Sequence, residues 1–292
     1  MRNSYIRLHI SILLAGATGL FGRLISINEL PLVHWRVLFA TLTLAIVLAM
    51  QKKLHRLPTR HLLQIAGCGL LLSIHWVFFY GSIKAANVSI GAVCFALVGF
   101  FTALLEPLIS RHRPSWRELL LSLITVAGVV LIFGLDSRYR WGIALGCISS
   151  FLYALFSITS KKVQASTGHK SSTMLLYELV GGGILLSMLS PIYGQLFPSV
   201  SLLPTPHDFL LLMVFASIFT IGPFLLQLQA LRSISAFTVN LSYNLEPVYT
   251  ISLAMILFGE SRELNNAFWM GITLIVLSVL LQTFFNFKAN KY

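Results

Sequence analysis

The sequence predicts an all-α integral membrane protein with ten transmembrane helices, arranged as two inverted five-helix repeats. Three observations lead to this prediction: 57% of the 292 residues are apolar or aromatic, only 10% are charged, and the apolar residues fall into ten long runs. A soluble domain usually carries about 25% charged residues. Ten spanning helices of roughly 20 residues each occupy most of the chain. These residues therefore leave no room for a separate soluble catalytic domain.

Charged residues, prolines or asparagines separate the ten predicted spans. The spans are 9–27, 31–50, 62–83, 88–109, 118–134, 142–160, 173–190, 209–230, 235–258 and 267–286. The fifth is short, and the seventh contains Glu178 and three consecutive glycines, so these two differ most from a uniform apolar helix. If one of these two segments did not cross the membrane, the number of spans would be odd and the two termini would lie on opposite sides of the bilayer.

The distribution of Lys and Arg predicts the orientation, because cytoplasmic loops collect these residues and short translocated loops do not. With the N-terminus inside, fifteen of the 21 Lys and Arg fall in inner segments and four in outer segments. We therefore expect a multi-pass protein of the plasma (inner) membrane with both termini in the cytoplasm. This asymmetry explains most of the net charge of +12, so no nucleic-acid partner is needed. The first apolar run lacks a small-residue cleavage site, so we expect a span rather than a signal peptide.

Five spans on each side of residue 138 predict two repeats, residues 1–137 and residues 138–292. A shift of 138 residues aligns Ser11 with Ser149 and Gly16 with Ala154. Chance similarity between apolar helices is the alternative explanation. Because each half has an odd number of spans, the second half runs through the bilayer in the opposite sense. Secondary transporters are often built in this way and bind substrate between the repeats, near the midplane.

Two stretches of the sequence resemble a known family. The first half contains AGATGLFGRLISINELPLVHWRVLFATLTLAIVL, and the second half ends with SISAFTVNLSYNLEPVYTISLAMILFGESRELNNAFWMGITLIVLSVLL. Over essentially its whole length, the chain resembles the EamA-type permeases of the drug/metabolite transporter superfamily. Arg23, Arg36, Pro247 and Gly271 match the family pattern, whereas the proline expected in the middle of the fourth span is absent. The resemblance implies ten helices in two inverted repeats and transport of a small metabolite.

Ionisable residues inside the bilayer must face a partner or a water-filled cavity, since exposure to hydrocarbon costs about 2.5 to 3.5 kcal/mol. Glu246 is the deepest charge, near the middle of the ninth span. It is a candidate for binding a substrate amine or for proton coupling, and a fixed ion pair is the structural alternative. Glu106 and Glu178 lie near the predicted inner ends, where we expect interfacial partners such as Arg111 or Lys170.

Neutral polar residues accompany Glu246 on the ninth span. Asn240 and Asn244 lie one helical turn apart, and Tyr243 lies three residues before Glu246, which predicts one broad polar stripe. Gln227 adds an amide on the eighth span. A stripe containing an acid, amides and a phenol favours a cavity wall over hydrogen bonding between helices, which is the usual role of amides in membranes.

Arg23 and Arg36 lie at similar depths on the first two spans, each about five residues from the outer end. Two guanidinium groups can hold a carboxylate or phosphate through paired hydrogen bonds. Alternatively, the side chains extend to the outer interface, and the short distance to the helix ends favours this second interpretation.

His75 lies in the middle of the third span and is followed by Trp76 and, further on, by Tyr80. A neutral imidazole beside aromatic walls suits an aromatic or amphipathic substrate, although a single His in an apolar helix is more often a packing residue. Pro223 and Pro247 interrupt the backbone hydrogen bonding of two spans and free the carbonyls of Phe219 and Tyr243. We expect kinks at both prolines that help a gate to move.

The predicted function is a secondary transporter that moves a small metabolite, an amino acid or related zwitterion, by alternating access with possible proton coupling. The sequence contains no nucleotide-binding, metal-binding or catalytic motif, so we expect neither an enzyme nor a cofactor. The alternatives are an intramembrane enzyme acting on lipid-linked substrates and a non-transporting sensor or scaffold. The expected partners are the metabolite, the lipid bilayer and protons, and a second copy of the chain is a further candidate.

Overall fold

The computed structural model describes residues 2–111, 113–133, 139–259 and 266–289. Within these ranges the regular structure is helical, without strands. The helices are α1 (Arg2–Gly16), α2 (Thr18–Leu24), α3 (Glu29–Met50), α4 (Thr59–Ala85), α5 (Val88–Phe95), α6 (Val98–Ser110), α7 (Trp116–Phe133), α8 (Arg140–Thr167), α9 (Ser171–Leu196), α10 (Pro206–Ser217), α11 (Ile221–Leu231), α12 (Ala236–Ser242), the 3-10 turn η2 (Tyr243–Leu245), α13 (Glu246–Phe258) and α14 (Asn266–Ala289).

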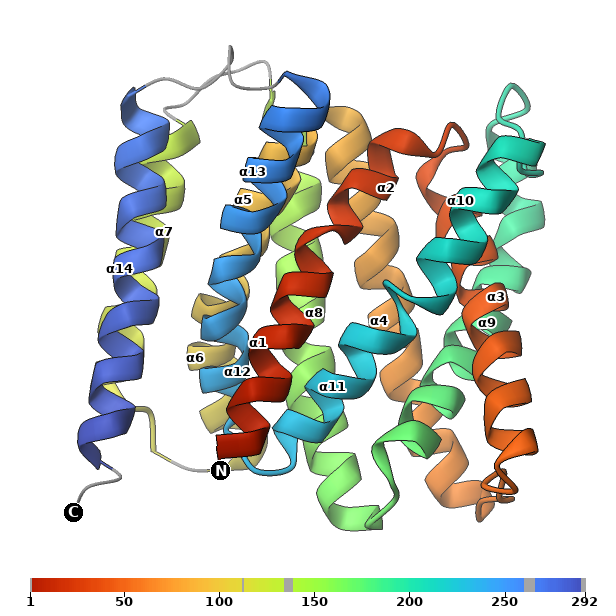
Figure 1. The fold of residues 1–292 in the computed structure, drawn as a ribbon, viewed down its shortest axis with the longest axis horizontal. Helices are drawn as coiled ribbons and strands as arrows, with labels where there is room; N and C mark the ends of the chain where they lie inside the picture. The colour runs from red at the N-terminus through yellow and green to blue at the C-terminus, as the bar shows by residue number, and fades with distance from the viewer. Residues whose placement is uncertain (1, 112, 134–138, 260–265, 290–292) are drawn as a thin grey trace.

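The predicted spans coincide with helical segments, which confirms the fold class. Among the described residues, eight helical segments are long and apolar enough to cross a membrane. The fifth and ninth predicted spans coincide with α7 and with the continuous α12, η2 and α13 segment. The start of α1 and the end of α14 lie at the same end of the bundle (Figure 1). The predicted repeat boundary between residues 137 and 138 lies outside the described residues.

Four spans are each built from two helices: the first, fourth, eighth and ninth. In the first span, Gly16 ends α1 at a close helix contact, where an added Cβ would come within 2.6 Å of the Tyr249 Cβ. The carbonyl of Gly16 accepts a hydrogen bond from the hydroxyl of Thr250 (2.8 Å). A polar side chain from another helix thus satisfies a backbone group that the interruption frees.

The interruptions in the eighth and ninth spans lie next to the two predicted prolines. Pro223 is in the first turn of α11, and Pro247 is in the first turn of α13. Three residues, 218–220, separate the end of α10 from the start of α11. Proline is tolerated in a first helical turn because no backbone donor is needed there. The Tyr243 carbonyl, which Pro247 was expected to leave free, accepts from the Glu246 N–H in the 3-10 turn. The α-helix is thus interrupted by the turn at residues 218–220 before Pro223, whereas before Pro247 it narrows to a 3-10 turn without leaving helical geometry.

Helices from the two halves of the chain pack against each other throughout the bundle. The contacts pair α4 with α8, α1 with α11, α3 with α9, α5 with α13 and α7 with α14. In Figure 1 the α7 and α14 pair lies at one edge of the bundle and the α3 and α9 pair at the opposite edge. The broken spans and the long helices α4 and α8 lie between these edges. The interior of the protein is thus formed jointly by both halves.

Candidate functional site

A small cavity lined by aromatic and charged side chains lies inside the bundle. It has a volume of about 30 Å³, which is room for one or two water molecules. Side chains from α1, α2, α3, α4, α5, α8, α11, η2 and α13 line it. They are Ala15, Thr18, Arg36, His75, Trp76, Phe79, Tyr80, Phe95, Tyr153, Phe224, Tyr243 and Glu246. The cavity thus combines one cation, one acid, one imidazole and several aromatic rings.

Arg36 is fully buried on α3, with 1% of its surface exposed. Its guanidinium carbon lies 4.0 Å from the centroid of the Trp76 ring and 4.2 Å from that of Phe215. Nε donates to the hydroxyl of Thr220 (2.7 Å), and Nη1 donates to the hydroxyl of Tyr80 (3.1 Å). The interpretation of Arg36 as a side chain extending to the outer interface is therefore wrong. Aromatic rings offer a cation a stabilising position inside the protein, and a guanidinium stacks on them well.

Glu246 faces the same cavity from the start of α13 and is 5% exposed. Among the described residues, the Glu246 carboxyl group has no partner for an ion pair or a hydrogen bond. Arg36 likewise lies beyond ion-pairing distance of every described carboxylate. The structural alternative of a fixed ion pair for Glu246 therefore does not apply in this conformation. An acid and a cation that line one cavity without pairing suit a ligand that carries both charges.

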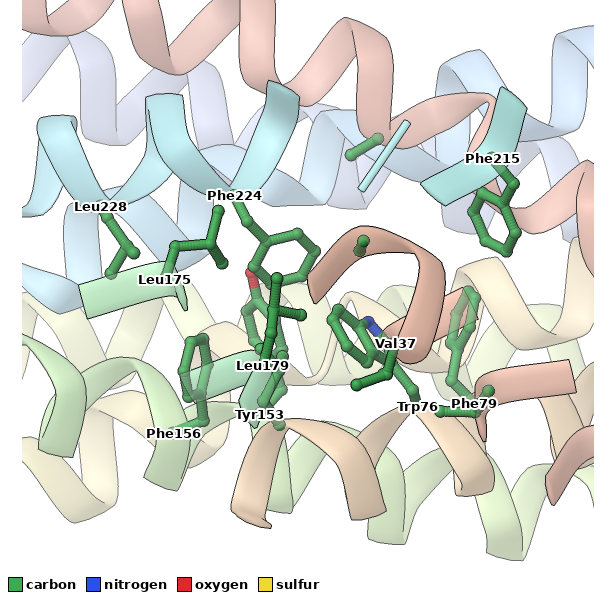
Figure 2. Packing of buried hydrophobic residues seen from close by; sticks show 14 of the residues in the cluster. Val37, Trp76, Phe79, Tyr153, Phe156, Leu175, Leu179, Phe215, Phe224 and Leu228 are labelled. Carbon is green, nitrogen blue, oxygen red and sulfur yellow. The ribbon is translucent and has the colours of Figure 1, made fainter. Parts of the chain in front are cut away.

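His75 and the aromatic residues form the remaining walls. His75 Nδ1 lies 2.9 Å from the carbonyl oxygen of Ser149 and 2.8 Å from the hydroxyl oxygen of the same residue. The His75 ring lies 4.7 Å from the ring of Tyr153, centroid to centroid. Trp76, Tyr153 and Phe224, from three different helices, point toward one another (Figure 2). This arrangement produces a compact aromatic enclosure next to the polar groups.

Tyr243 joins the cavity wall to the broken eighth span. Its hydroxyl lies 2.7 Å from Ser11 Oγ, and Ser11 Oγ donates to the carbonyl of Pro223 (2.5 Å). Three separate segments, α1, α11 and η2, are thus joined in one short chain of hydrogen bonds. Movement of α11 about the interruption before it would directly disturb this chain.

Four of the predicted binding residues lie outside the cavity lining. Asn240 donates to Thr102 (2.8 Å) and accepts from Ser157 (3.0 Å), while Asn244 donates to Thr125 (3.2 Å). Residues two positions apart on a helix point to nearly opposite sides. Asn244 therefore points between helices together with Asn240, while Tyr243 and Glu246 face the cavity. The single broad stripe predicted for the ninth span is therefore wrong.

Gln227 and Arg23 are the other two predicted residues that do not line the cavity. Gln227 lies behind the wall and accepts a hydrogen bond from the Tyr153 hydroxyl (2.8 Å). Arg23 is exposed near the end of α2, with its guanidinium 4.4 Å from the centroid of the Phe258 ring. Arg23 is therefore an exposed side chain near the end of its span, in keeping with the alternative interpretation.

The two remaining acids do not pair with interfacial cations as expected. Glu106 accepts from the backbone N–H groups of Ala236 and Phe237, at 3.3 and 2.9 Å, and so caps the start of α12. Glu178 is completely buried, where Oε1 accepts from Ser160 (2.5 Å). An added Cβ on Gly69 would lie 1.8 Å from the Glu178 backbone oxygen, so close packing of α4 on α9 encloses this acid.

Several residues of the site were not predicted from the sequence. Thr18, Phe95, Tyr153 and Phe224 line the cavity, and Thr220 orients Arg36. Each is an ordinary residue of an apolar helix, and only the neighbouring helices give it a role. The pairing of Ser11 with Ser149 in the internal alignment was the one available signal, because both serines contact the site. The described residues contain no group of three or more potential metal ligands.

The chain is similar to known transporters over most of its length. It shares 25% identity over 237 residues with an uncharacterized transporter of Clostridium kluyveri, covering 77% of this chain and 73% of the relative. It shares 22% identity over 284 residues with the uncharacterized transporter YxxF of Bacillus subtilis, covering 94% and 88%.

One solved crystal structure has the same fold, with a TM-score of 0.71 at 16% identity, covering 97% of this chain and 98% of that chain. The sequence profile of the EamA-like transporter family matches twice, at residues 4–134 and at residues 140–284. The chain therefore belongs to the EamA-like transporter family and carries the duplication typical of it.

Proposed function

We propose that the protein is a secondary transporter that moves a small zwitterionic metabolite, such as an amino acid, by alternating access. The observation that carries this proposal is the position of Arg36 and Glu246 on the walls of one central cavity. A zwitterion presents a carboxylate to the guanidinium and an amine to the carboxyl group. The aromatic rings of Trp76, Phe79 and Tyr153 would contact its side chain.

Two inverted repeats, residues 1–137 and 138–292, would supply the movement. The aligned residues Ser11 and Ser149 make related contacts: Ser11 on α1 bonds Pro223 on α11, and Ser149 on α8 bonds His75 on α4. The helix pairs α1 with α11 and α4 with α8 are therefore comparable parts of the two halves. Such halves can rock against each other and open the cavity first to one side and then to the other.

The cavity of about 30 Å³ is too small for a metabolite, so substrate entry requires the helices to separate. The interruptions before Pro223 and Pro247 offer places where α11 and α13 can pivot. Both prolines lie next to residues of the site, since Thr220 bonds Arg36 and Glu246 directly precedes Pro247. Hence we assign these prolines to gating rather than to direct ligand contact.

Glu246 is the candidate for proton coupling. It is buried, faces the cavity and has no hydrogen-bond partner among the described residues, so a proton and a substrate amine would compete for the same carboxyl oxygens. With the inner ends assigned from the Lys and Arg distribution, the transporter would lie in the inner membrane with both termini in the cytoplasm.

Substrate flux in proteoliposomes containing the purified full chain tests this function. The vesicles carry an imposed pH gradient, and the uptake or release of radiolabelled amino acids is measured one by one. We expect the wild type to transport at least one of them, and Glu246→Gln to lose the response to the pH gradient. Absence of flux for the whole panel would contradict the proposed substrate class.

Glu178→Gln is the matched control for Glu246→Gln. It neutralises a second buried acid that does not line the cavity, and the glutamine oxygen can still accept the hydrogen bond of Ser160. This variant should transport like the wild type. If Glu246→Gln also retained pH-driven transport, the role of Glu246 in proton coupling would be wrong.

A further inference from the structure

A second and much larger hollow lies at the end of the bundle where α1 begins. It has a volume of about 490 Å³ and shares no lining residue with the central cavity. Its walls come from the start of α1, the end of α3 and the residues after it, the start of α9 and the end of α11. They comprise Arg7, Leu44, Val47, Leu48, Gln51, Lys53, Lys170, Ser171, Ser172, Leu225, Gln229 and Arg232, and we refer to this hollow as the basic pocket.

Four cations converge on the basic pocket from four different segments of the chain: Arg7, Lys53, Lys170 and Arg232. All four side chains are exposed. Among the described residues, neither Asp nor Glu lines the pocket. The bias of Lys and Arg toward cytoplasmic loops explains many cations at this end of the bundle. It does not explain why four of them surround one hollow without an acid to neutralise them.

Most of the donor groups of these cations are available for a ligand. Arg232 Nη2 donates to the backbone carbonyl of His169 (3.2 Å), and Lys53 Nζ donates to the side-chain oxygen of Gln51 (2.8 Å). These single bonds leave further N–H groups on both side chains. The hydrogen bonds orient the two heads without cancelling their charge, since both acceptors are neutral.

The backbone adds to the positive potential of the pocket. The 26-residue helix α9 begins at Ser171, and its N-cap residue Lys170 makes no side-chain cap hydrogen bond. The first turn of α9 contains no acid. Free N–H groups at a helix start carry partial positive charge and bind anions well. Here they coincide with the four cations, so the helix start reinforces a site that the side chains already form.

The basic pocket also has apolar lining residues: Leu44, Val47, Leu48 and Leu225. A phosphate diester with attached hydrocarbon matches both kinds of lining residue, with its phosphate at the cations and its hydrocarbon against the apolar side chains. Basic pockets between transmembrane helices are suited to anionic lipid head groups. We propose that the basic pocket binds a phosphate-bearing anion, the shared chemistry of an anionic phospholipid head group and of free phosphate.

Two probes, dioleoylphosphatidylglycerol and inorganic phosphate, distinguish the two sources. The full chain is purified in detergent, each probe is titrated separately, and binding is measured by native mass spectrometry and by the shift in thermal unfolding temperature. Saturable binding of the lipid that raises the unfolding temperature identifies a lipid site. Saturable binding of inorganic phosphate alone identifies a site for a soluble anion, and either result supports the proposal.

The variant Arg7→Gln/Lys170→Gln tests the position of the site, because neither side chain has a hydrogen-bond partner among the described residues. We expect about 30-fold weaker binding, since each Lys or Arg close to an anionic surface contributes roughly fivefold. The matched control is Arg56→Gln/Arg60→Gln, which removes two exposed cations outside the pocket. The control should bind like the wild type.

Three outcomes would overturn the proposal: no saturable binding of either probe, unchanged binding by Arg7→Gln/Lys170→Gln, or an equal loss in the control. An equal loss would mean that the diffuse charge of this face, rather than the basic pocket, attracts the anion. If the double variant unfolds at a lower temperature without any probe, Lys170→Gln alone replaces it, and the same comparison with Arg60→Gln decides the question. These results do not depend on whether the central cavity transports a zwitterion.

Discussion

The guanidinium of Arg36 lies over the ring of Trp76, with 4.0 Å between the guanidinium carbon and the ring centroid. A second ring, that of Phe215, lies 4.2 Å away. Aromatic faces stabilise this cation without neutralising it. The charge of Arg36 is therefore still available to a ligand carboxylate in the central cavity, which would not be true of an arginine paired with an acid.

We predict that Arg36→Lys weakens substrate binding about tenfold or more while the protein still folds. Lysine keeps the charge, but its ammonium cannot stack on two rings or reproduce the planar hydrogen bonds to Thr220 and Tyr80. Substrate titration in the proteoliposome assay measures the apparent KM. The control is Arg23→Lys, which lies outside the cavity and should retain the wild-type KM. Equal KM values for both variants would argue against a binding role for Arg36.

Asn240 should affect stability rather than transport. Its two hydrogen bonds, to Thr102 and from Ser157, join neighbouring helices outside the cavity. Hydrogen bonds between transmembrane helices contribute about 0.6 kcal/mol each on average, so Asn240→Ala should reduce the free energy of unfolding by about 1 kcal/mol. Thermal unfolding and the flux assay check both parts. A marked rise in KM with unchanged stability would contradict this prediction and indicate that Asn240 contacts the substrate.

Gly69 and Gly67 offer a matched pair on α4. An added Cβ on Gly69 would lie 1.8 Å from the backbone oxygen of Glu178, whereas nothing lies within 4 Å of one on Gly67. Because a backbone contact cannot yield easily, Gly69→Ala should separate α4 from α9 and cost about 3 kcal/mol. Gly67→Ala should be neutral or stabilise the helix by about 0.5 to 1 kcal/mol. Similar unfolding temperatures for the two variants would show that α4 and α9 pack less closely than described.

The loop between α8 and α9 should make stability depend on pH. His169 Nε2 lies 3.1 Å from His61 Nδ1, and burial followed by the neighbouring His61 lowers the pKa of His169 below its ordinary value of 6.5. The unfolded chain then binds a proton more readily than the folded protein, so stability is complete above pH 6.5 and decreases as the pH falls below it. Thermal unfolding from pH 8 to pH 5 should show this decrease in the wild type and less of it in His169→Gln. Identical pH profiles would contradict the prediction.

Much of the site could be predicted from the sequence, because a polar or charged residue far from the ends of an apolar span is a candidate for a cavity. Glu246, Arg36, His75, Trp76, Tyr80 and Tyr243 were predicted and line the central cavity. A charged or polar group in hydrocarbon needs a polar environment, so position along an apolar span is informative by itself. The same reasoning favoured an interfacial Arg36, since it could not anticipate two aromatic rings from α4 and α10 around one guanidinium.

Residues such as Asn240 and Asn244 could not be assigned from spacing. In a continuous α-helix, at about 100° per residue, Asn244 would already lie roughly 160° around the axis from Glu246 and Asn240 roughly 120°. The 3-10 turn at Tyr243–Leu245 changes these angles further. Pro247 indicated that the helix of the ninth span is irregular, but not by what angle the helix turns there. The direction in which a side chain points after such a turn depends on the helices that pack around it.

By itself, the sequence determined that this chain is a membrane protein with ten helices, because the length and composition of apolar runs depend only on the bilayer. Two stretches of the sequence also carried its resemblance to the EamA-type permeases. Only the tertiary structure decided which polar side chains share a cavity, which ones join helices, and that four distant cations surround the basic pocket. Those relationships arise from contacts between segments far apart in the chain, and such contacts leave no periodic pattern in the order of residues.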